Sequence, residues 1–246
     1  MRKEQLININ PAARRTLRLC GWFGPISIGI CLVGLVVAGA LPFPLGPDNT
    51  QEEVVAFYSG GTHVVMGLAV ASVGLGLMAL LIAGITFVMW KSEGDAPILT
   101  LIQLVTGTIT VACLMFPIMI MAIAAFRPGR FGELTVLMND ISWLLFITPI
   151  APFIAQDISI AIAILTTERE LFPRWLGYFN LWVGFTFTFD IITYAFREGP
   201  FAWNKLLILW LAFLSYSLWA FAMGYGVLKA IPAQASGNYV TLEDAG

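Results

Sequence analysis

Two aspartates lie deep inside long apolar stretches of the sequence, where a charged side chain is costly. Asp157 ends the segment Thr-Pro-Ile-Ala-Pro-Phe-Ile-Ala-Gln-Asp, and Asp190 is the acid of Thr-Phe-Thr-Phe-Asp-Ile-Ile-Thr-Tyr. Insertion scales assign about 2.5–3.5 kcal/mol to an aspartate at the centre of a bilayer. We therefore expect each carboxyl to face protein or water, to have a partner, or to be protonated because of desolvation.

Pro149 and Pro152 precede Gln156 and Asp157 in one apolar stretch. Each proline removes an intrahelical hydrogen bond and clashes with the preceding turn, so the pair predicts a kinked helix near mid-membrane. A broken helix with an acid one to two turns further on is typical of an ion or proton site. The alternative is a kink that only shapes packing, with Asp157 bonded to a neighbouring hydroxyl. The sequence does not separate these two interpretations.

Asp190 belongs to a polar stripe. Thr186, Asp190, Thr193, Tyr194 and Arg197 fall at helical spacing, which places them on one face of a helix. This face is expected to point into the protein. It is either a polar pathway or ligand-facing wall that opens outward, or the result of Asp190 pairing with an arginine of the outer loops. The structural pairing is the favoured interpretation.

Small and hydroxyl residues recur at intervals of three and four in the stretch 98–126: Thr100, Gln103, Thr106, Gly107, Thr110, Cys113 and Pro117. Such a face lets helices approach closely and form hydrogen bonds across the gap. Pro117 predicts a further helix kink. Gln103 would reach Asp157 if their two helices are neighbours. In the stretch 62–90, Gly67, Ala71 and Gly74 likewise predict a close-packing face.

The sequence contains no metal or cofactor motif. His63 is the only histidine, and one imidazole cannot hold a di-iron or copper centre. The three cysteines show no zinc spacing or disulfide framework. A lipid-modifying enzyme that uses Asp157 and Asp190 as acid and base would need both at one site, whereas we expect them at different depths. Enzymatic activity is therefore uncertain and is the less favoured interpretation.

The amino-acid composition indicates whether water or lipid surrounds this chain. Of its 246 residues, 59% are hydrophobic and 11% are charged, and the mean hydropathy is +0.84. Soluble proteins carry about 25% charged residues, so this chain cannot cover itself with solvated side chains. We expect a lipid bilayer around most of it. A net charge of −2 without a basic patch argues against nucleic-acid binding.

Six stretches are long and apolar enough to cross a bilayer, which needs about 20 residues each. They are residues 20–41, 62–90, 98–126, 140–166, 174–196 and 203–229. These runs are continuously apolar, whereas barrel strands alternate. We predict an all-α, polytopic transmembrane helical bundle at 20–230, between a basic N-terminal segment (1–19) and a C-terminal tail (231–246). The short loops leave no room for a second domain.

The distribution of basic residues predicts that both ends are cytoplasmic. With the N-terminus inside, nine of the 13 Lys and Arg residues fall on the inner side and four on the outer side. The outer four are Arg127, Arg130, Arg197 and Lys205. The segment Ala38-Gly39-Ala40 is similar to a signal-peptide cleavage site, but the preceding apolar stretch is longer than about 7–15 residues. We therefore expect the first span to be retained.

Four segments carry a resemblance to a protein family: 125–128 (Ala-Phe-Arg-Pro), 139–143 (Asn-Asp-Ile-Ser-Trp), 172–178 (Phe-Pro-Arg-Trp-Leu-Gly-Tyr) and 199–204 (Gly-Pro-Phe-Ala-Trp-Asn). Through them the chain resembles an uncharacterised family of six-span integral membrane proteins found in actinobacteria and other soil bacteria. The resemblance covers nearly the whole chain. It implies a location in the bacterial inner membrane and no particular activity.

Two functional hypotheses follow. The first is a small-solute transporter or permease, or a proton-coupled carrier, with Asp157, Gln156 and Gln103 along an internal path and Asp190 near its outer mouth. The second is a non-catalytic binding or accessory protein that senses a lipid or hydrophobe, or that serves a larger membrane complex. In the second case the acids are structural. Both hypotheses are compatible with a homo-oligomer or a membrane protein partner.

Overall fold

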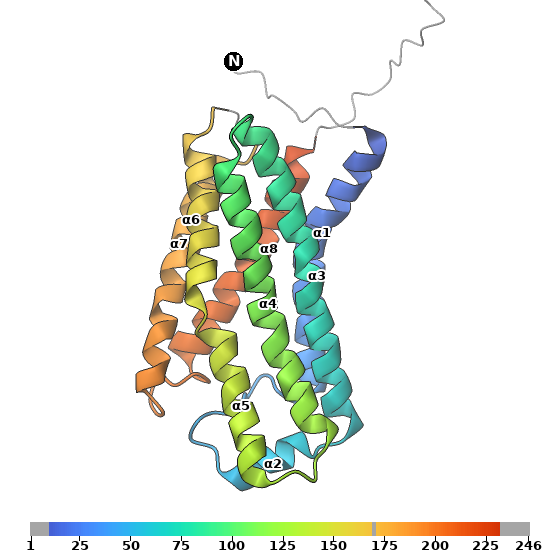
Figure 1. Ribbon diagram of the computed structural model, residues 1–246, viewed down its shortest axis with the longest axis vertical. Helices are drawn as coiled ribbons and strands as arrows, with labels where there is room; N and C mark the ends of the chain where they lie inside the picture. The colour runs from blue at the N-terminus through green and yellow to red at the C-terminus, as the bar shows by residue number, and fades with distance from the viewer. Residues whose placement is uncertain (1–9, 169–170, 232–246) are drawn as a thin grey trace, which may run out of the picture.

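The computed structural model describes residues 10–168 and 171–231, and these residues form an all-α helical bundle without strands (Figure 1). The predicted all-α class is therefore confirmed. The tail 232–246 and the basic residues Arg2, Lys3 and Arg169 lie outside the described residues. The α-helices are α1 (Pro11–Val37), α2 (Gln51–Tyr58), α3 (Thr62–Glu93), α4 (Ile98–Phe126), α5 (Gly132–Ile147), α6 (Ile150–Thr166), α7 (Arg174–Phe187) and α8 (Leu211–Ala230). A 3-10 helix, η1 (Thr188–Ala195), continues α7, and a π-helix, η2 (Leu206–Trp210), leads into α8.

The first helix begins earlier than its apolar stretch. Asn10 caps α1 by accepting the backbone N–H of Ala13 at 2.8 Å, and Pro11 occupies the first helical position, where a missing N–H costs nothing. The helix therefore carries Arg14, Arg15 and Arg18 in its first turns, ahead of the predicted span that starts at residue 20.

Five helical segments of the described chain have the length and composition of membrane spans: Pro11–Val37, Thr62–Glu93, Ile98–Phe126, Gly132–Thr166 and Leu206–Ala230. The predicted span 174–196 is divided between α7, with 14 residues, and η1, with eight. Together these rise about 37 Å, more than the roughly 30 Å of a hydrocarbon core. The outward faces are apolar, with Val33 60% and Val73 59% exposed, as expected where lipid is the neighbour.

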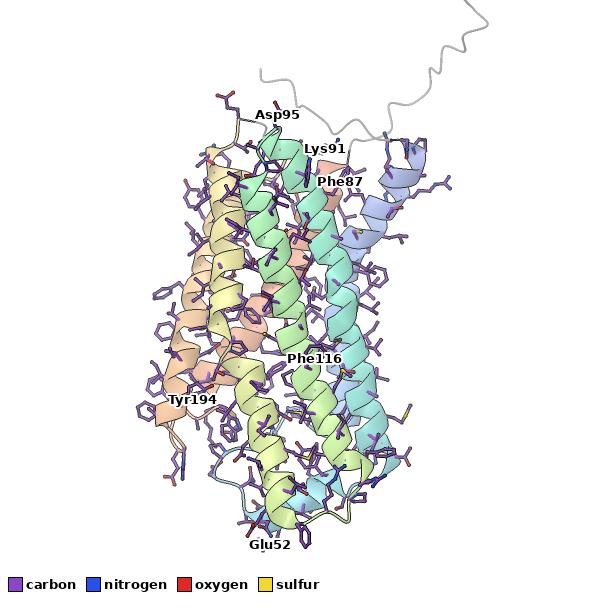
Figure 2. The ribbon with its side chains drawn as sticks, viewed as in Figure 1. Glu52, Phe87, Lys91, Asp95, Phe116 and Tyr194 are labelled. Carbon is purple, nitrogen blue, oxygen red and sulfur yellow. The ribbon has the colours of Figure 1, made fainter. Side chains whose placement is uncertain are left out.

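The helices run alternately between the two ends of the bundle. The described chain starts and ends at the same end, where α1 begins and α8 stops (Figure 1). Lys91 and Asp95 lie at this end, and Glu52 lies at the other (Figure 2). At the Glu52 end, the ammonium of Lys205 lies 3.3 Å from a carboxylate oxygen of Asp48, which ties together two loops assigned to one side by the sequence.

Glycines set the closest helix crossing, that of α1 with α3. A Cβ on Gly67 would lie 2.5 Å from the backbone N of Ala38, and one on Gly74 would lie 2.6 Å from the backbone N of Cys31. Ala71 completes this surface, because its backbone N would lie 2.5 Å from a Cβ on Gly34. The close-packing face predicted for residues 67, 71 and 74 is thus confirmed, and larger side chains here would separate the helices.

A second close crossing brings α8 against α1. Pro25 has no N–H, so the carbonyl of Gly21, one turn before it, lacks its intrahelical partner. A Cβ on Gly224 would lie 2.6 Å from that carbonyl oxygen, so only glycine lets α8 approach so closely. This crossing fixes the position of α8, which contributes Tyr216 and Trp219 to the interior.

The prolines act differently from one another. The predicted span 140–166 is two helices that break at Thr148–Pro149, so the predicted kink is a complete interruption. Pro152 lies in the first turn of α6, where backbone N–H groups have no intrahelical partner. The predicted loss of a hydrogen bond at Pro152 is therefore wrong. Pro117 lies inside α4, which continues unbroken to Phe126.

Candidate functional site

Three helices lose regular α-helical geometry around one place in the bundle. α5 and α6 are separated at Thr148–Pro149, α7 changes to the 3-10 helix η1, and the π-helix η2 precedes α8. Residues beside each interruption (Ile147, Phe187 and Leu209) line the same cavity. Non-helical backbone at membrane depth is tolerated only where it is buried in protein or lines a cavity, and such interruptions concentrate at functional sites.

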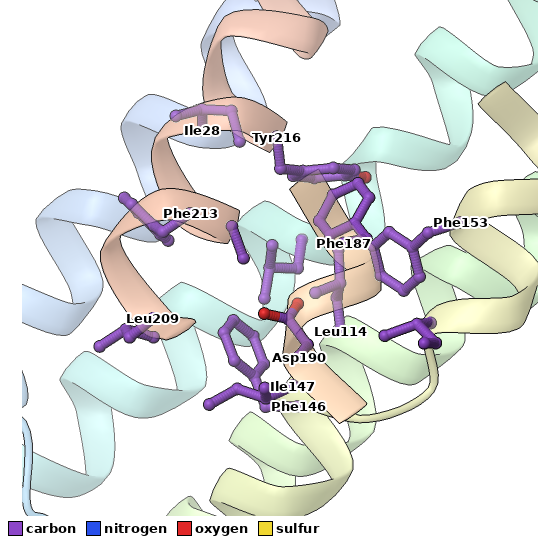
Figure 3. A pocket seen from close by; sticks show the side chains of 13 residues that line it. Ile28, Leu114, Phe146, Ile147, Phe153, Phe187, Asp190, Leu209, Phe213 and Tyr216 are labelled. Carbon is purple, nitrogen blue, oxygen red and sulfur yellow. The ribbon is translucent and has the colours of Figure 1, made fainter. Parts of the chain in front are cut away.

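The cavity has a volume of about 40 Å³. Its walls are mainly apolar, and they come from seven α-helices and both irregular segments. The lining residues are Ile28, Leu75, Leu114, Phe146, Ile147, Ile150, Phe153, Phe187, Asp190, Leu209, Ala212, Phe213 and Tyr216 (Figure 3). Five of these side chains are aromatic rings. Asp190 is the one lining residue with a carboxyl group, and it lies among the rings.

Asp190 is buried without a partner for one of its oxygens. Its side chain is 2% exposed, and Oδ1 forms no hydrogen bond within the described residues. The favoured interpretation from sequence, an ion pair with an outer arginine, is wrong for this part of the chain. Arg130 instead donates to the backbone carbonyl of Ile123 at 2.7 Å. Buried polar atoms are almost always hydrogen-bonded, so an exception of this kind calls for a functional explanation.

The polar stripe divides at the start of η1. A 3-10 helix has three residues per turn, so Asp190 and Thr193 share a buried face while Tyr194 turns outward and is 64% exposed. The prediction that Tyr194 shares the stripe is wrong for this reason. Thr186, still in α7, is buried and donates to the carbonyl of Val183 at 2.7 Å. The Tyr194 hydroxyl lies 2.8 Å from Oγ1 of Thr148 and so joins η1 to the α5–α6 break.

Tyr216 lies between the two acids and was missed from the sequence. It lines the cavity with Asp190, and its hydroxyl is also within electrostatic reach of the Asp157 carboxyl. The hydroxyl is buried and has no hydrogen-bond partner in the described chain. Its ring stacks on Trp219, with centroids 5.4 Å apart and planes at 14°. A tyrosine within an apolar run resembles ordinary core packing, so the sequence offered little signal.

Asp157 does not line the cavity; α7 and α8 cover it. Its side chain is 3% exposed and packs on Gly184, where a Cβ would lie 3.3 Å from the Asp157 Cβ. The indole N–H of Trp219 donates to Oδ1 of Asn180 at 2.9 Å, and the Asp157 carboxyl lies close enough to compete for it. No hydrogen bond joins Asp157 to a neighbouring hydroxyl in the described residues, so the hydroxyl partner that the sequence suggested is absent there.

Gln103 and Gln156 meet at the interface of α4 and α6. Oε1 of Gln103 accepts from the Thr86 hydroxyl at 2.7 Å, and its amide nitrogen is buried without a partner. The amide nitrogen of Gln156 is also unpaired and would lie 2.9 Å from a Cβ on Gly107, one turn beyond Gln103. The two helices are neighbours as expected. No hydrogen bond joins Gln103 to Asp157 in the described residues.

A second, polar pocket of about 430 Å³ lies at the end of the bundle where α3 meets α4. Glu93 lines it and caps α4: its carboxylate accepts the backbone N–H groups of Leu99 at 3.1 Å and Thr100 at 2.7 Å. The hydroxyl of Thr100 also donates to Glu93. The sequence reading missed Glu93, although an acid before a helix that begins after Pro97 is a recognisable capping signal.

Within residues 10–168 and 171–231, no group of three or more His, Cys, Asp and Glu side chains could hold a metal ion. The long apolar helices and lipid-like outer surface fit an integral membrane protein. Comparison of the chain with protein-family models, with curated proteins and with solved structures gives no match.

Proposed function

We propose that this protein is a six-span integral membrane protein of the bacterial inner membrane with both ends in the cytoplasm, and that it is a proton-coupled carrier of a small solute. The lengths of the apolar helices and the position of both described chain ends at one end of the bundle support six crossings. The excess of Lys and Arg on that side supports the orientation. The four segments that resemble a six-span bacterial family agree with this topology.

One observation carries the proposal: Asp190, a buried carboxyl with one unpaired oxygen, lines a cavity beside three interrupted helices. Such a carboxyl group lowers the stability of the protein unless it binds a ligand or a proton. Discontinuous spans around a central site are the means by which many carriers bind solutes and change access.

A series of buried polar groups lies between the residues that line the polar pocket and those that line this cavity. Glu93 bonds to Thr100, Gln103 follows one turn along α4, and Gln156 packs on the next turn at Gly107. Gln156 adjoins Asp157, whose charge reaches Tyr216 at the wall that contains Asp190. We call this set the polar chain: Glu93, Thr100, Gln103, Gln156, Asp157, Tyr216 and Asp190. Its unpaired amides and hydroxyl are suited to ordered water, which would carry protons between the two pockets.

Voltage-driven proton uptake into proteoliposomes tests the polar chain. Vesicles loaded with a pH-sensitive dye and given an inside-negative potassium diffusion potential should acidify faster with the wild-type protein than without protein. Asp157→Asn should reduce the rate to that of empty vesicles, because the amide keeps the shape of the side chain but cannot exchange a proton. Glu198→Gln, in an exposed loop, is the matched control and should behave as wild type. Equal rates in wild type and Asp157→Asn would contradict the proposal.

A binding or accessory protein is the second candidate, and the burial of Asp157 against Gly184 and Trp219 favours it. In that case the acid serves packing and not proton movement. Asp157→Ala would then lower the melting temperature in detergent, while proteoliposomes with the wild-type protein would take up protons no faster than empty vesicles. The two measurements separate the candidates.

A further inference from the structure

The cavity combines an acid with aromatic walls. Phe146, Phe153, Phe187, Phe213 and Tyr216 contribute rings, and Asp190 contributes the carboxyl group (Figure 3). Aromatic faces carry negative electrostatic potential and attract cations, most strongly where water is excluded. A positively charged group in this space would interact favourably with both components.

The unpaired oxygen of Asp190 narrows the ligand class further. No Lys, Arg or His lines the cavity, so an anion would meet only the carboxyl group. An apolar ligand would leave Oδ1 of Asp190 buried and without a partner. A cation that carries N–H groups would supply the missing hydrogen bond and the opposite charge together.

The volume of the cavity limits the size of the ligand. A single water needs about 10–15 Å³ of such space, so a cavity of about 40 Å³ holds about three heavy atoms. We propose that the cavity binds a small alkylammonium ion of the size of methylammonium or dimethylammonium. Its N–H groups donate to Asp190, and its methyl groups contact the aromatic rings. This identifies the solute class of the carrier and so depends on the proposed function for its physiological meaning, although binding can be measured separately.

Isothermal titration calorimetry of the full chain in detergent tests this assignment, with dimethylammonium chloride as the ligand and sodium chloride at equal ionic strength as the reference. Dimethylammonium should bind to the wild type, and Asp190→Asn should weaken binding at least tenfold. Ala212→Leu, which fills the cavity but keeps the acid, should weaken it similarly. Glu198→Gln should bind as wild type. Unchanged binding in Asp190→Asn would overturn the assignment.

A size series in the wild-type protein covers the case in which the variants do not fold. Methylammonium and dimethylammonium should bind, whereas tetraethylammonium, which has no N–H and is larger than the cavity, should not. Equal binding of all three, or no binding of any, overturns the assignment. Absence of binding together with voltage-driven proton uptake would remove the alkylammonium ligand and leave the proton path intact. Binding without proton uptake would support the ligand site and contradict the carrier.

Discussion

Replacing Asp190 by leucine should stabilise the protein while abolishing its function. Leucine branches at Cγ as aspartate does, so it occupies nearly the same space without requiring a hydrogen bond. Oδ1 of Asp190 has no partner in the described chain, and the surrounding wall is apolar. The substitution therefore removes an unsatisfied group and creates no new one, unlike most substitutions of a buried polar residue.

The expected gain in stability follows from the environment of the Asp190 carboxyl group. Relief of one buried, unsatisfied polar group contributes about 1–3 kcal/mol. Insertion scales separate leucine from aspartate by about 3–4 kcal/mol at the bilayer centre, which serves as an upper bound because Asp190 lies toward one end of the bundle. In a protein of this size, 1 kcal/mol corresponds to roughly 2–4 °C in melting temperature. We therefore expect an increase of about 2–12 °C.

Differential scanning fluorimetry in detergent, with the intrinsic fluorescence of the eight tryptophans as the signal, measures this change. Asn180→Leu is the contrasting variant. Asn180 accepts the indole N–H of Trp219 and donates to the backbone carbonyl of Leu176, so its loss removes two buried hydrogen bonds and should lower the melting temperature. A lower melting temperature for Asp190→Leu would refute the reasoning, because it would mean that the carboxyl group has a stabilising partner.

Three further predictions concern the frame around the site. Gly67→Val should lower the melting temperature in detergent by several degrees, because its Cβ would meet the backbone of α1, whereas Gly29→Val, with open space around it, should not. Trp219→Phe should lower the free energy of unfolding by about 1–3 kcal/mol, because it leaves Oδ1 of Asn180 without its donor. Thermal unfolding measures this change, with the partly exposed Trp182→Phe as the control. Hydrogen bonds from the Asn49 side chain and the Thr50 backbone lower the pKa of Glu53. The cap of α2 is therefore fully present above the ordinary glutamate pKa and is lost as the pH falls through the lowered pKa. Hydrogen exchange of the Thr50 amide should accelerate in that pH range, and Glu53→Gln should abolish this change.

The sequence predicted features that depend on local chemistry. Long apolar runs specify helices in lipid, and a proline specifies a missing donor, so the bundle class and a distortion near Pro149 could be predicted, although the complete interruption there could not. Glycine spacing specified the α1–α3 crossing because close backbone approach depends on side-chain size alone. Each of these properties is carried by a short segment whatever surrounds it.

Features imposed by neighbouring segments could not be predicted. No proline or glycine marks the change from α7 to η1 at Thr188, so the spacing of Asp190 and Tyr194 was interpreted with a period of 3.6 residues where the structure has three. Tyr216 became a site residue only because α8 places it between the cavity and Asp157. The effect of Pro152 could not be predicted either, because it removes an intrahelical hydrogen bond only if it lies beyond the first turn of α6, and the sequence did not show where α6 begins.

The two acids have the same chemical cost in a bilayer, but the fold treats them differently. Asp157 lies beside the Trp219 indole and packs on Gly184, which makes room for its side chain, and it does not line the cavity. Asp190 keeps an unpaired oxygen inside an apolar cavity. A ligand or proton that supplies the missing hydrogen bond at such a residue gains more binding free energy than it would at a group that is already hydrogen-bonded. In the proposed carrier, this difference assigns ligand binding to Asp190 and places Asp157 behind it on the polar chain.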